Sequence, residues 1–90
     1  MMQSNNVLIL DVRTEDEFSE GHIEGAILLP LDMLRKMAED IIVSDSQAVL
    51  VYCRSGRRSS EAAEILTEMG FLNVYDFGGI LSWPYEIVQP

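Results

Sequence analysis

Ala48-Val-Leu-Val-Tyr-Cys-Arg-Ser-Gly-Arg-Arg-Ser59 joins the most strand-like run of the chain to its only cysteine and to three of its six positive charges. Residues 48–52 are apolar, with β-branched and aromatic side chains that favour a buried strand. From Ser59 onward the apolar residues recur at helical spacing. The segment therefore predicts a strand with Cys53 at its carboxyl end, a short loop containing glycine, and then a helix.

Three further strands are predicted around this unit. The wholly apolar run Val7–Leu10 is typical of a strand that is buried on both faces, as in a parallel sheet. Gly25–Pro30 forms a second strand, which ends at its proline, and Asn73–Asp76 forms the last. Because strands alternate with helices, we expect an α/β fold with a mostly parallel central sheet of about four strands, flanked by helices.

Two further helices are predicted between these strands. Thr14 and Glu17 have the spacing of a capping box, in which each side chain accepts a hydrogen bond from the other residue's amide. A short helix should follow and end at Gly21. The segment Leu31–Ile42 carries apolar residues at helical spacing, and Asp32 is the expected cap of this second helix.

The composition describes a small acidic domain. With 90 residues, of which 48% are hydrophobic and 23% charged, the sequence suits one folded domain that spans residues 1–90. A net charge of −9 should repel nucleic acid and anionic membranes, so neither is an expected partner. A single cysteine cannot form an intramolecular disulfide, and no signal peptide or membrane-spanning run is evident. We therefore expect a cytoplasmic protein.

Cys53 lies where an α/β sheet binds its ligands, outside the carboxyl end of a strand. Loop amides and the positive end of the following helix stabilise a negative group there. Arg54, Arg57 and Arg58 add positive charge at close range. Such surroundings should lower the pKa of the thiol and favour the nucleophilic thiolate without a histidine base.

The alternative is that Cys53 is a small buried hydrophobic residue and the arginines form a solvated helix start. Helix starts prefer Asp and Glu, so three cations in five residues of an acidic chain favour the functional interpretation. We expect Arg58 to close the loop, whereas Arg54 and Arg57 face incoming donors.

Several segments together resemble the rhodanese family in its small single-domain form. They are Leu10-Asp-Val-Arg13, Glu17-Phe18, Gly21-His-Ile-Glu-Gly-Ala26, Tyr52-Cys-Arg-Ser-Gly-Arg-Arg-Ser59, and Gly78-Gly79 with Trp83. The resemblance implies a thiosulfate sulfurtransferase, in which Cys53 takes a sulfane sulfur from a small anionic donor such as thiosulfate, becomes a persulfide, and passes the sulfur to cyanide or a thiol. It also implies that the substrate-binding residues are Arg54, Ser55, Gly56, Arg57, Arg58 and Ser59. No metal or other cofactor is expected.

The N-terminal end departs from the family pattern. Common members have a strand and a helix ahead of the Asp-Val-Arg segment, where only residues 1–6 stand here. We therefore expect a minimal rhodanese-like fold that lacks the usual N-terminal strand and helix. One sheet edge would be less covered, so we expect a monomer or a weak dimer.

Two other functions stay open. A persulfide carrier or sulfur-sensing module would load sulfur on Cys53 and deliver it to a protein partner. A cysteine phosphatase or arsenate reductase would use a longer Cys-x5-Arg loop, but Cys53 to Arg58 is Cys-x4-Arg, and Ser59 holds the arginine position of a phosphatase. One residue fewer should shrink the loop, which favours binding of a single sulfur atom over phosphate.

Other chemically capable residues are expected to be structural. His22, the only histidine, lies in the segment that links the first helix to the next strand. Asp11 and Arg13, at the carboxyl end of the first strand, should pair with neighbours and support the loops. Large side chains expected in the core include Met33, Met37, Met69 and Trp83.

Overall fold

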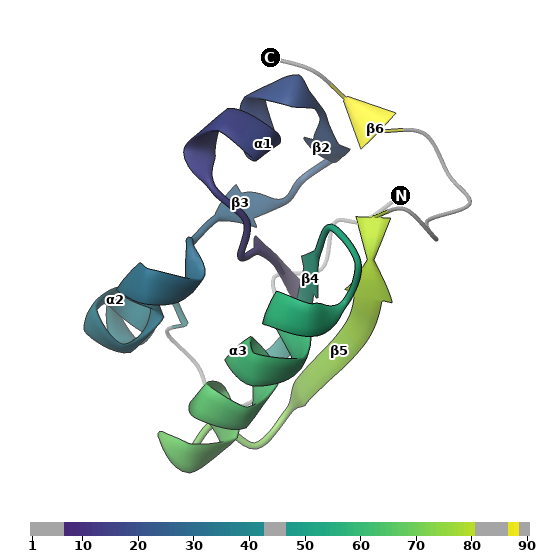
Figure 1. Ribbon diagram of the computed structural model, residues 1–90. Coiled ribbons are helices and arrows are strands. Elements are labelled where there is room, and N and C mark those ends of the chain that lie inside the picture. Colours follow the sequence, from purple (N-terminus) through teal and green to yellow (C-terminus); the bar gives the residue numbers. More distant parts are fainter. Residues whose placement is uncertain (1–6, 43–46, 81–86, 89–90) are drawn as a thin grey trace.

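The central feature of the fold is a four-stranded parallel sheet (Figure 1). The computed structural model describes residues 7–42, 47–80 and 87–88. Its elements are β1 (Val7–Asp11), α1 (Glu15–Glu20), β2 (His22–Ile23), β3 (Ile27–Leu28), η1 (Leu31–Met33), α2 (Leu34–Ile41), β4 (Ala48–Cys53), α3 (Arg57–Glu68), β5 (Val74–Gly79) and β6 (Ile87–Val88). The strand order is β3-β1-β4-β5 with every pairing parallel, which confirms the predicted sheet.

Strand β4 lies in the interior of this sheet. It pairs with β1 from Ala48 opposite Val7 to Tyr52 opposite Asp11, and with β5 on its other side. Its last three residues are buried, and Cys53 is only 1% exposed. Because the strands are parallel, the carboxyl ends of β1, β4 and β5 meet at one edge of the sheet, where ligands bind in such folds.

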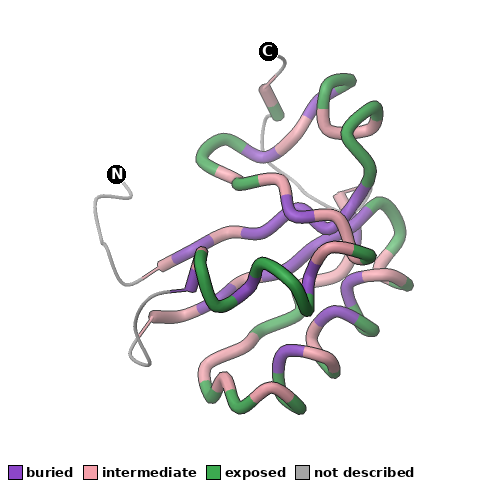
Figure 2. The backbone as a smooth tube through the Cα atoms, turned by 90° about the vertical axis from the view of Figure 1, so that its left-hand side faces the viewer, coloured by how far each residue is buried: buried purple, intermediate pink, exposed green. Residues whose placement is uncertain are grey.

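Helices α2 and α3 lie side by side on one face of the sheet, and α1 lies beyond the carboxyl ends of the strands (Figure 1). Helix α2 buries Leu34 and Ala38, and α3 buries Ala62 and Leu66 against the strands. Figure 2 shows buried positions along the central strands and at intervals along the helices. A single apolar core therefore supports the edge at which β4 ends.

The capping box is confirmed, but the start of the second helix differs from the prediction. Thr14 and Glu17 cap α1 reciprocally, and Gly21 ends that helix. Asp32 was wrongly expected as a cap, because the helical segment opens with the 3₁₀ turn η1, which already contains it. Pro30 precedes this turn with φ −54°, the value that its ring imposes, so helical geometry begins one residue before Asp32.

Other helix and strand boundaries also differ from the predicted ones. Helix α3 begins at Arg57 rather than Ser59, and β5 continues to Gly79 instead of ending at Asp76. The predicted strand 25–30 shrinks to β3, because a turn with Gly25 at φ +86° occupies its beginning. Strand β2 was not predicted, since it depends on antiparallel pairing with β6, more than sixty residues later.

Two of the three methionines expected in the core do pack there. Met33 and Met69 are partly buried against the core. Met37 is 36% exposed, which corrects its placement, since Leu34 and Ala38 form the buried stripe of α2 and Met37 lies at the margin of that stripe. Trp83 lies outside the described residues. None of the helices described is long and apolar enough to cross a membrane.

Candidate active site

The loop after β4 curls around the sulfur of Cys53. It spans residues 54–56, and α3 begins directly after it. Gly56 has φ +102°, a left-handed conformation that glycine adopts without a steric cost. This turn brings the Gly56 amide back to the cysteine, where its N–H donates to Sγ at 2.9 Å.

The surroundings of Cys53 favour its thiolate. Burial raises the pKa of the thiol, but hydrogen bonds to the sulfur outweigh this effect and leave the pKa below its ordinary value. The donors are the amide and hydroxyl of Ser59 and the amides of Gly56 and Arg58. Backbone amides therefore contribute most of the stabilisation, as in other anion-binding turns.

The three arginines of the loop have different surroundings. Arg54 and Arg57 are exposed. Arg58 directs its amide to the sulfur, whereas its guanidinium donates to both oxygens of Glu17, at 2.8 and 2.9 Å. This pair, together with the hydrogen bonds from Thr14, lowers the pKa of Glu17 to about 2. Arg58 thus fixes the start of α3 to α1, and its charge is already compensated.

A buried polar network supports the edge of the sheet beneath the loop. The Arg13 guanidinium donates to the Asp11 carboxylate through Nε at 2.9 Å and Nη2 at 2.6 Å, so the two residues, which were expected to pair with neighbours, pair with each other. Arg13 also donates to the Gly21 carbonyl at 2.6 Å. The Tyr52 hydroxyl donates to Asp11 at 2.6 Å and accepts from the Ile23 amide. Burial and the hydrogen bond to Asp11 raise the pKa of Tyr52.

The end of β5 forms the other side of the loop. Ser59 is fully buried, and its Oγ lies 2.7 Å from Asp76 Oδ1 and 3.2 Å from the Gly78 carbonyl. The Gly78 amide donates to the same Asp76 oxygen at 2.8 Å. Any Cβ at Gly79 would collide with the backbone of Arg54. The loop therefore rests directly on the backbone of β5.

Three residues in these contacts were not predicted from the sequence to belong to the site. Apart from the family resemblance, Tyr52 was assigned only to a strand and Glu17 only to the capping box, and Asp76 was assigned only to the end of the last strand. The sequence offers one weak indication, since Tyr52 and Glu17 both fall in segments shared with the rhodanese family. The sequence gives no such indication for Asp76, because its contact with Ser59 depends on the packing of β5 beside α3.

His22 lies at the end of α1. Its Nδ1 donates to the Phe18 carbonyl at 3.0 Å, and its ring stacks on Phe18 with centroids 3.7 Å apart. These contacts hold the turn between α1 and β2, as expected of a structural residue.

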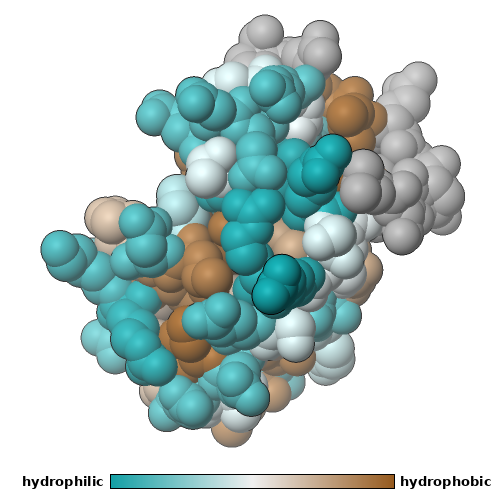
Figure 3. Space-filling model, viewed as in Figure 1, coloured by the Kyte–Doolittle hydropathy of each residue, from teal (hydrophilic) through white to brown (hydrophobic). Residues whose placement is uncertain are grey.

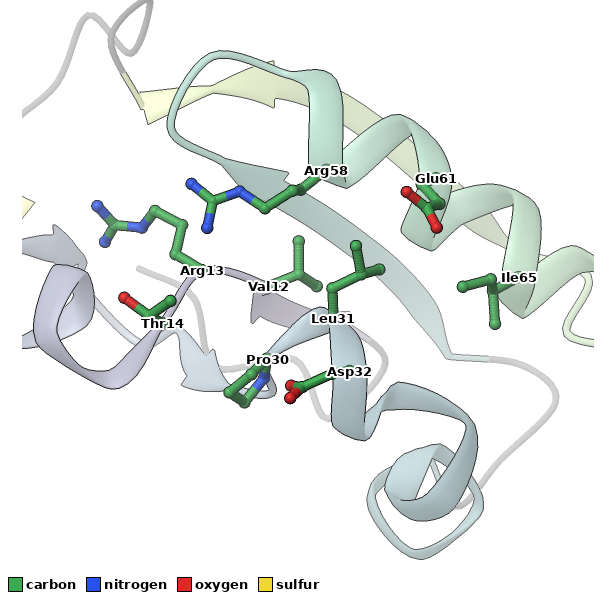
Figure 4. A pocket seen from close by; sticks show the side chains of 9 residues that line it. All are labelled: Val12, Arg13, Thr14, Pro30, Leu31, Asp32, Arg58, Glu61 and Ile65. Carbon is green, nitrogen blue, oxygen red and sulfur yellow. The ribbon is translucent and has the colours of Figure 1, made fainter.

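A groove of about 400 Å³ lies beside the first turns of α3. Figure 3 shows it as hydrophobic surface in a hollow between η1 and α3, with hydrophilic side chains around it. In Figure 4, Arg13 and Arg58 lie at one end, Val12 and Leu31 in the middle, and Ile65 at the other end. Because the Arg58 side chain lines this groove while the Arg58 amide donates to the Cys53 sulfur, the groove adjoins the cysteine site.

Comparison with known proteins agrees with this architecture. Residues 1–85 match the rhodanese-like domain family. The thiosulfate sulfurtransferase PspE of Escherichia coli is 37% identical over 71 residues, which cover 79% of this chain and 68% of that protein. The thiosulfate sulfurtransferase GlpE of Coxiella burnetii is 34% identical over 84 residues, which cover 92% of this chain and 77% of that protein.

A solved structure gives the same result. A rhodanese with anions from E. coli superposes with a TM-score of 0.88 at 32% identity, covering 93% of this chain and 99% of that one. The family match over residues 1–85 includes the cysteine loop and the sheet that carries it. The chain belongs to the rhodanese-like domain family and is a rhodanese-like sulfurtransferase.

Proposed function

We propose that the chain moves a sulfane sulfur from an anionic donor such as thiosulfate to a thiophilic acceptor through a persulfide on Cys53. The observation that carries this proposal is the ring of hydrogen-bond donors around the sulfur, with the Gly56 amide at 2.9 Å. In the first step the Cys53 thiolate attacks the outer sulfur of thiosulfate. The sulfur–sulfur bond of the donor breaks, and sulfite leaves with its electron pair.

The second step returns the cysteine to its starting state. Cyanide or a thiolate attacks the outer sulfur of the persulfide, the bond to Cys53 Sγ breaks, and the thiolate is released. The loop amides suit both steps, because the sulfur atoms that they surround carry negative charge before and after each transfer.

Exposed arginines support an anionic donor. In the described part of the chain Arg54 and Arg57 form no ion pair, whereas the charge of Arg58 is compensated by Glu17. On a chain of net charge −9, these two exposed cations attract a small anion locally. The need to keep a reactive thiol reduced also favours a cytoplasmic location.

A persulfide carrier that delivers sulfur to a protein is the second candidate. The groove beside Arg58 favours it, because an apolar hollow of about 400 Å³ is much larger than cyanide requires and suits an organic thiol or the side chains of a partner. Fast turnover with thiosulfate and cyanide alone would favour the enzyme. A rise in transfer rate that only one partner protein produces would favour the carrier.

Intact-mass spectrometry after incubation with thiosulfate tests the step that both candidates share. We expect the mass of one sulfur atom to be added, and no addition in Cys53→Ala. If neither thiosulfate nor a polysulfide adds sulfur, both candidates are wrong. Release of phosphate from an aryl phosphate, abolished in Cys53→Ser, would instead indicate a cysteine phosphatase.

A further inference from the structure

The groove beside α3 is elongated and has an apolar base. Arg58, Glu61 and Ile65 lie three and four positions apart, so they share one side of α3 and extend over about 10 Å of that helix. Val12 and Leu31 form the middle of the groove (Figure 4). The hollow is open to the surface (Figure 3), so its shape suits apolar side chains of a protein segment laid along the helix.

The charges around this groove do not balance. The two arginines that line it each already form an ion pair with a carboxylate of the chain. Asp32 in η1 and Glu61 in α3 line it from opposite sides, and both are exposed. Among the described residues neither of them forms an ion pair. Two negative charges therefore stand beside an apolar surface, so a complementary segment carries positive charge next to apolar side chains.

One end of the groove adjoins Cys53. The Val12 amide donates to the carbonyl of Tyr52, the residue before Cys53, at 3.0 Å. The Arg58 amide donates to the sulfur. The pKa of the Arg58 guanidinium is raised by Glu17 and, less strongly, by the charge on Cys53, which places that guanidinium within electrostatic reach of the sulfur. A protein that fills the groove therefore lies beside the cysteine site, and its thiol needs no channel through the groove.

We propose that this groove docks the sulfur acceptor, a protein segment in which lysine or arginine flanks apolar side chains. The inference rests on the proposed persulfide of Cys53 and names the kind of acceptor that receives its sulfur. The acceptor thiolate attacks the outer sulfur, the sulfur–sulfur bond of the persulfide breaks, and Cys53 leaves as a thiolate while the acceptor becomes the persulfide. Donor and acceptor are then recognised by opposite charges, since the exposed Arg54 and Arg57 attract the anionic donor.

Three synthetic peptides of equal length test the match to the groove. Each contains one cysteine. The first adds two leucines and two lysines, the second has glutamate in place of lysine, and the third has serine in place of leucine. The loss of sulfur from the loaded chain is followed by intact mass at low salt. We expect the first peptide to remove the sulfur about tenfold faster than either of the others.

The double variant Asp32→Asn with Glu61→Gln removes both negative charges of the groove. In it, the preference for the lysine peptide over the glutamate peptide should fall from about tenfold to below about threefold. The matched control is Glu39→Gln with Glu64→Gln, which removes two exposed carboxylates outside the groove and should keep the preference. The proposal is wrong if the control loses the preference equally, or if the leucine and serine peptides react alike.

Methyl NMR separates a failure of this inference from a failure of the proposed function. In Cys53→Ala, peptides with serine in place of cysteine take no part in sulfur transfer, yet the lysine form should shift the methyl resonances of Leu31 and Ile65 and the glutamate form should not. Such shifts in a chain that loads no sulfur would refute the proposed function and retain the docking site. Sulfur loading without these shifts would refute the docking site and retain the proposed function.

Discussion

The two sides of the cysteine loop are held in different ways. On the α1 side, the contact is an ion pair between Arg58 and Glu17, whose side chains are 34% and 24% exposed. On the β5 side, backbone lies on backbone, and Gly79 leaves no room for a single Cβ. A pair of long side chains can adjust, whereas two packed backbones cannot. The loop therefore has one adjustable side and one rigid side.

The largest effect is expected from Gly79→Ala on the rigid side. The added Cβ would overlap backbone atoms of Arg54 and Ser55, so the loop must move. We expect sulfur loading to fall about 100-fold, since small displacements of reacting groups cost this much, and stability to fall by about 1–3 kcal/mol. Loading is measured by intact mass over time, and stability by urea denaturation.

The matched control is Gly25→Ala. It also inserts one methyl group at a glycine, here at φ +86° with no atom close to the new Cβ. It should destabilise the chain by about 1–2 kcal/mol through its backbone conformation and leave loading intact. Equal loss of loading in both variants would show that the rigid contact has no special part in the site.

A smaller effect is expected from Glu17→Gln on the adjustable side. Gln preserves the capping box and removes only the charge that pairs with Arg58. The pKa of Glu17 is about 2 in the folded chain and 4.5 ordinarily. Its contribution to the free energy of unfolding is therefore present above about pH 5 and is lost as the pH falls toward 2. For a pair exposed to this degree we expect about 1 kcal/mol.

Urea denaturation of both chains between pH 2 and pH 7 measures this difference. The parent should be the more stable at neutral pH, and the two curves should converge in acid. Asp16→Asn, in the same helical turn but without a contact to Arg58, should stay close to the parent. A difference between Glu17→Gln and the parent that is independent of pH would refute the ion pair as its cause.

The smallest effect is expected from Arg54→Gln, because only the backbone of Arg54, and not its side chain, takes part in the contact with Gly79. Arg54 is exposed and forms no ion pair in the described part of the chain. Its loss should raise the KM for thiosulfate about threefold at low salt, and about 0.5 M salt should remove the difference. Lys36→Gln on α2 also removes one positive charge, but at a position distant in sequence from Cys53. If it raises the KM equally, the net charge rather than the position of Arg54 attracts the donor.

Much of the fold follows from local patterns in the sequence. The apolar runs at 7–10 and 48–52 form strands because the sheet buries them. The capping box of Thr14 and Glu17 needs only residues within one helical turn. The pairing of Asp11 with Arg13 spans two residues and is equally local. Such features depend only on neighbours in the chain, so a single sequence is sufficient to predict them.

The contacts that could not be predicted from the sequence join residues that lie far apart in the chain. Arg58 meets Glu17 across 41 positions, and Tyr52 meets Asp11 across the same separation. Strand β2 exists because β6 pairs with it. No periodicity in the sequence encodes these contacts, because each results from how the strands are ordered in the sheet.

The buried position of Cys53 at the meeting point of distant segments also bears on how the chain is made. Its sulfur is stabilised by a loop that rests on Gly79, and α3, which carries Arg58 and Ser59, packs against β5. During synthesis the cysteine emerges well before β5, so we expect an ordinary thiol in the growing chain at that stage. We expect the pKa of Cys53 to fall only when the last strand of the central sheet has been added, so that the reactivity of Cys53 would report the completion of folding.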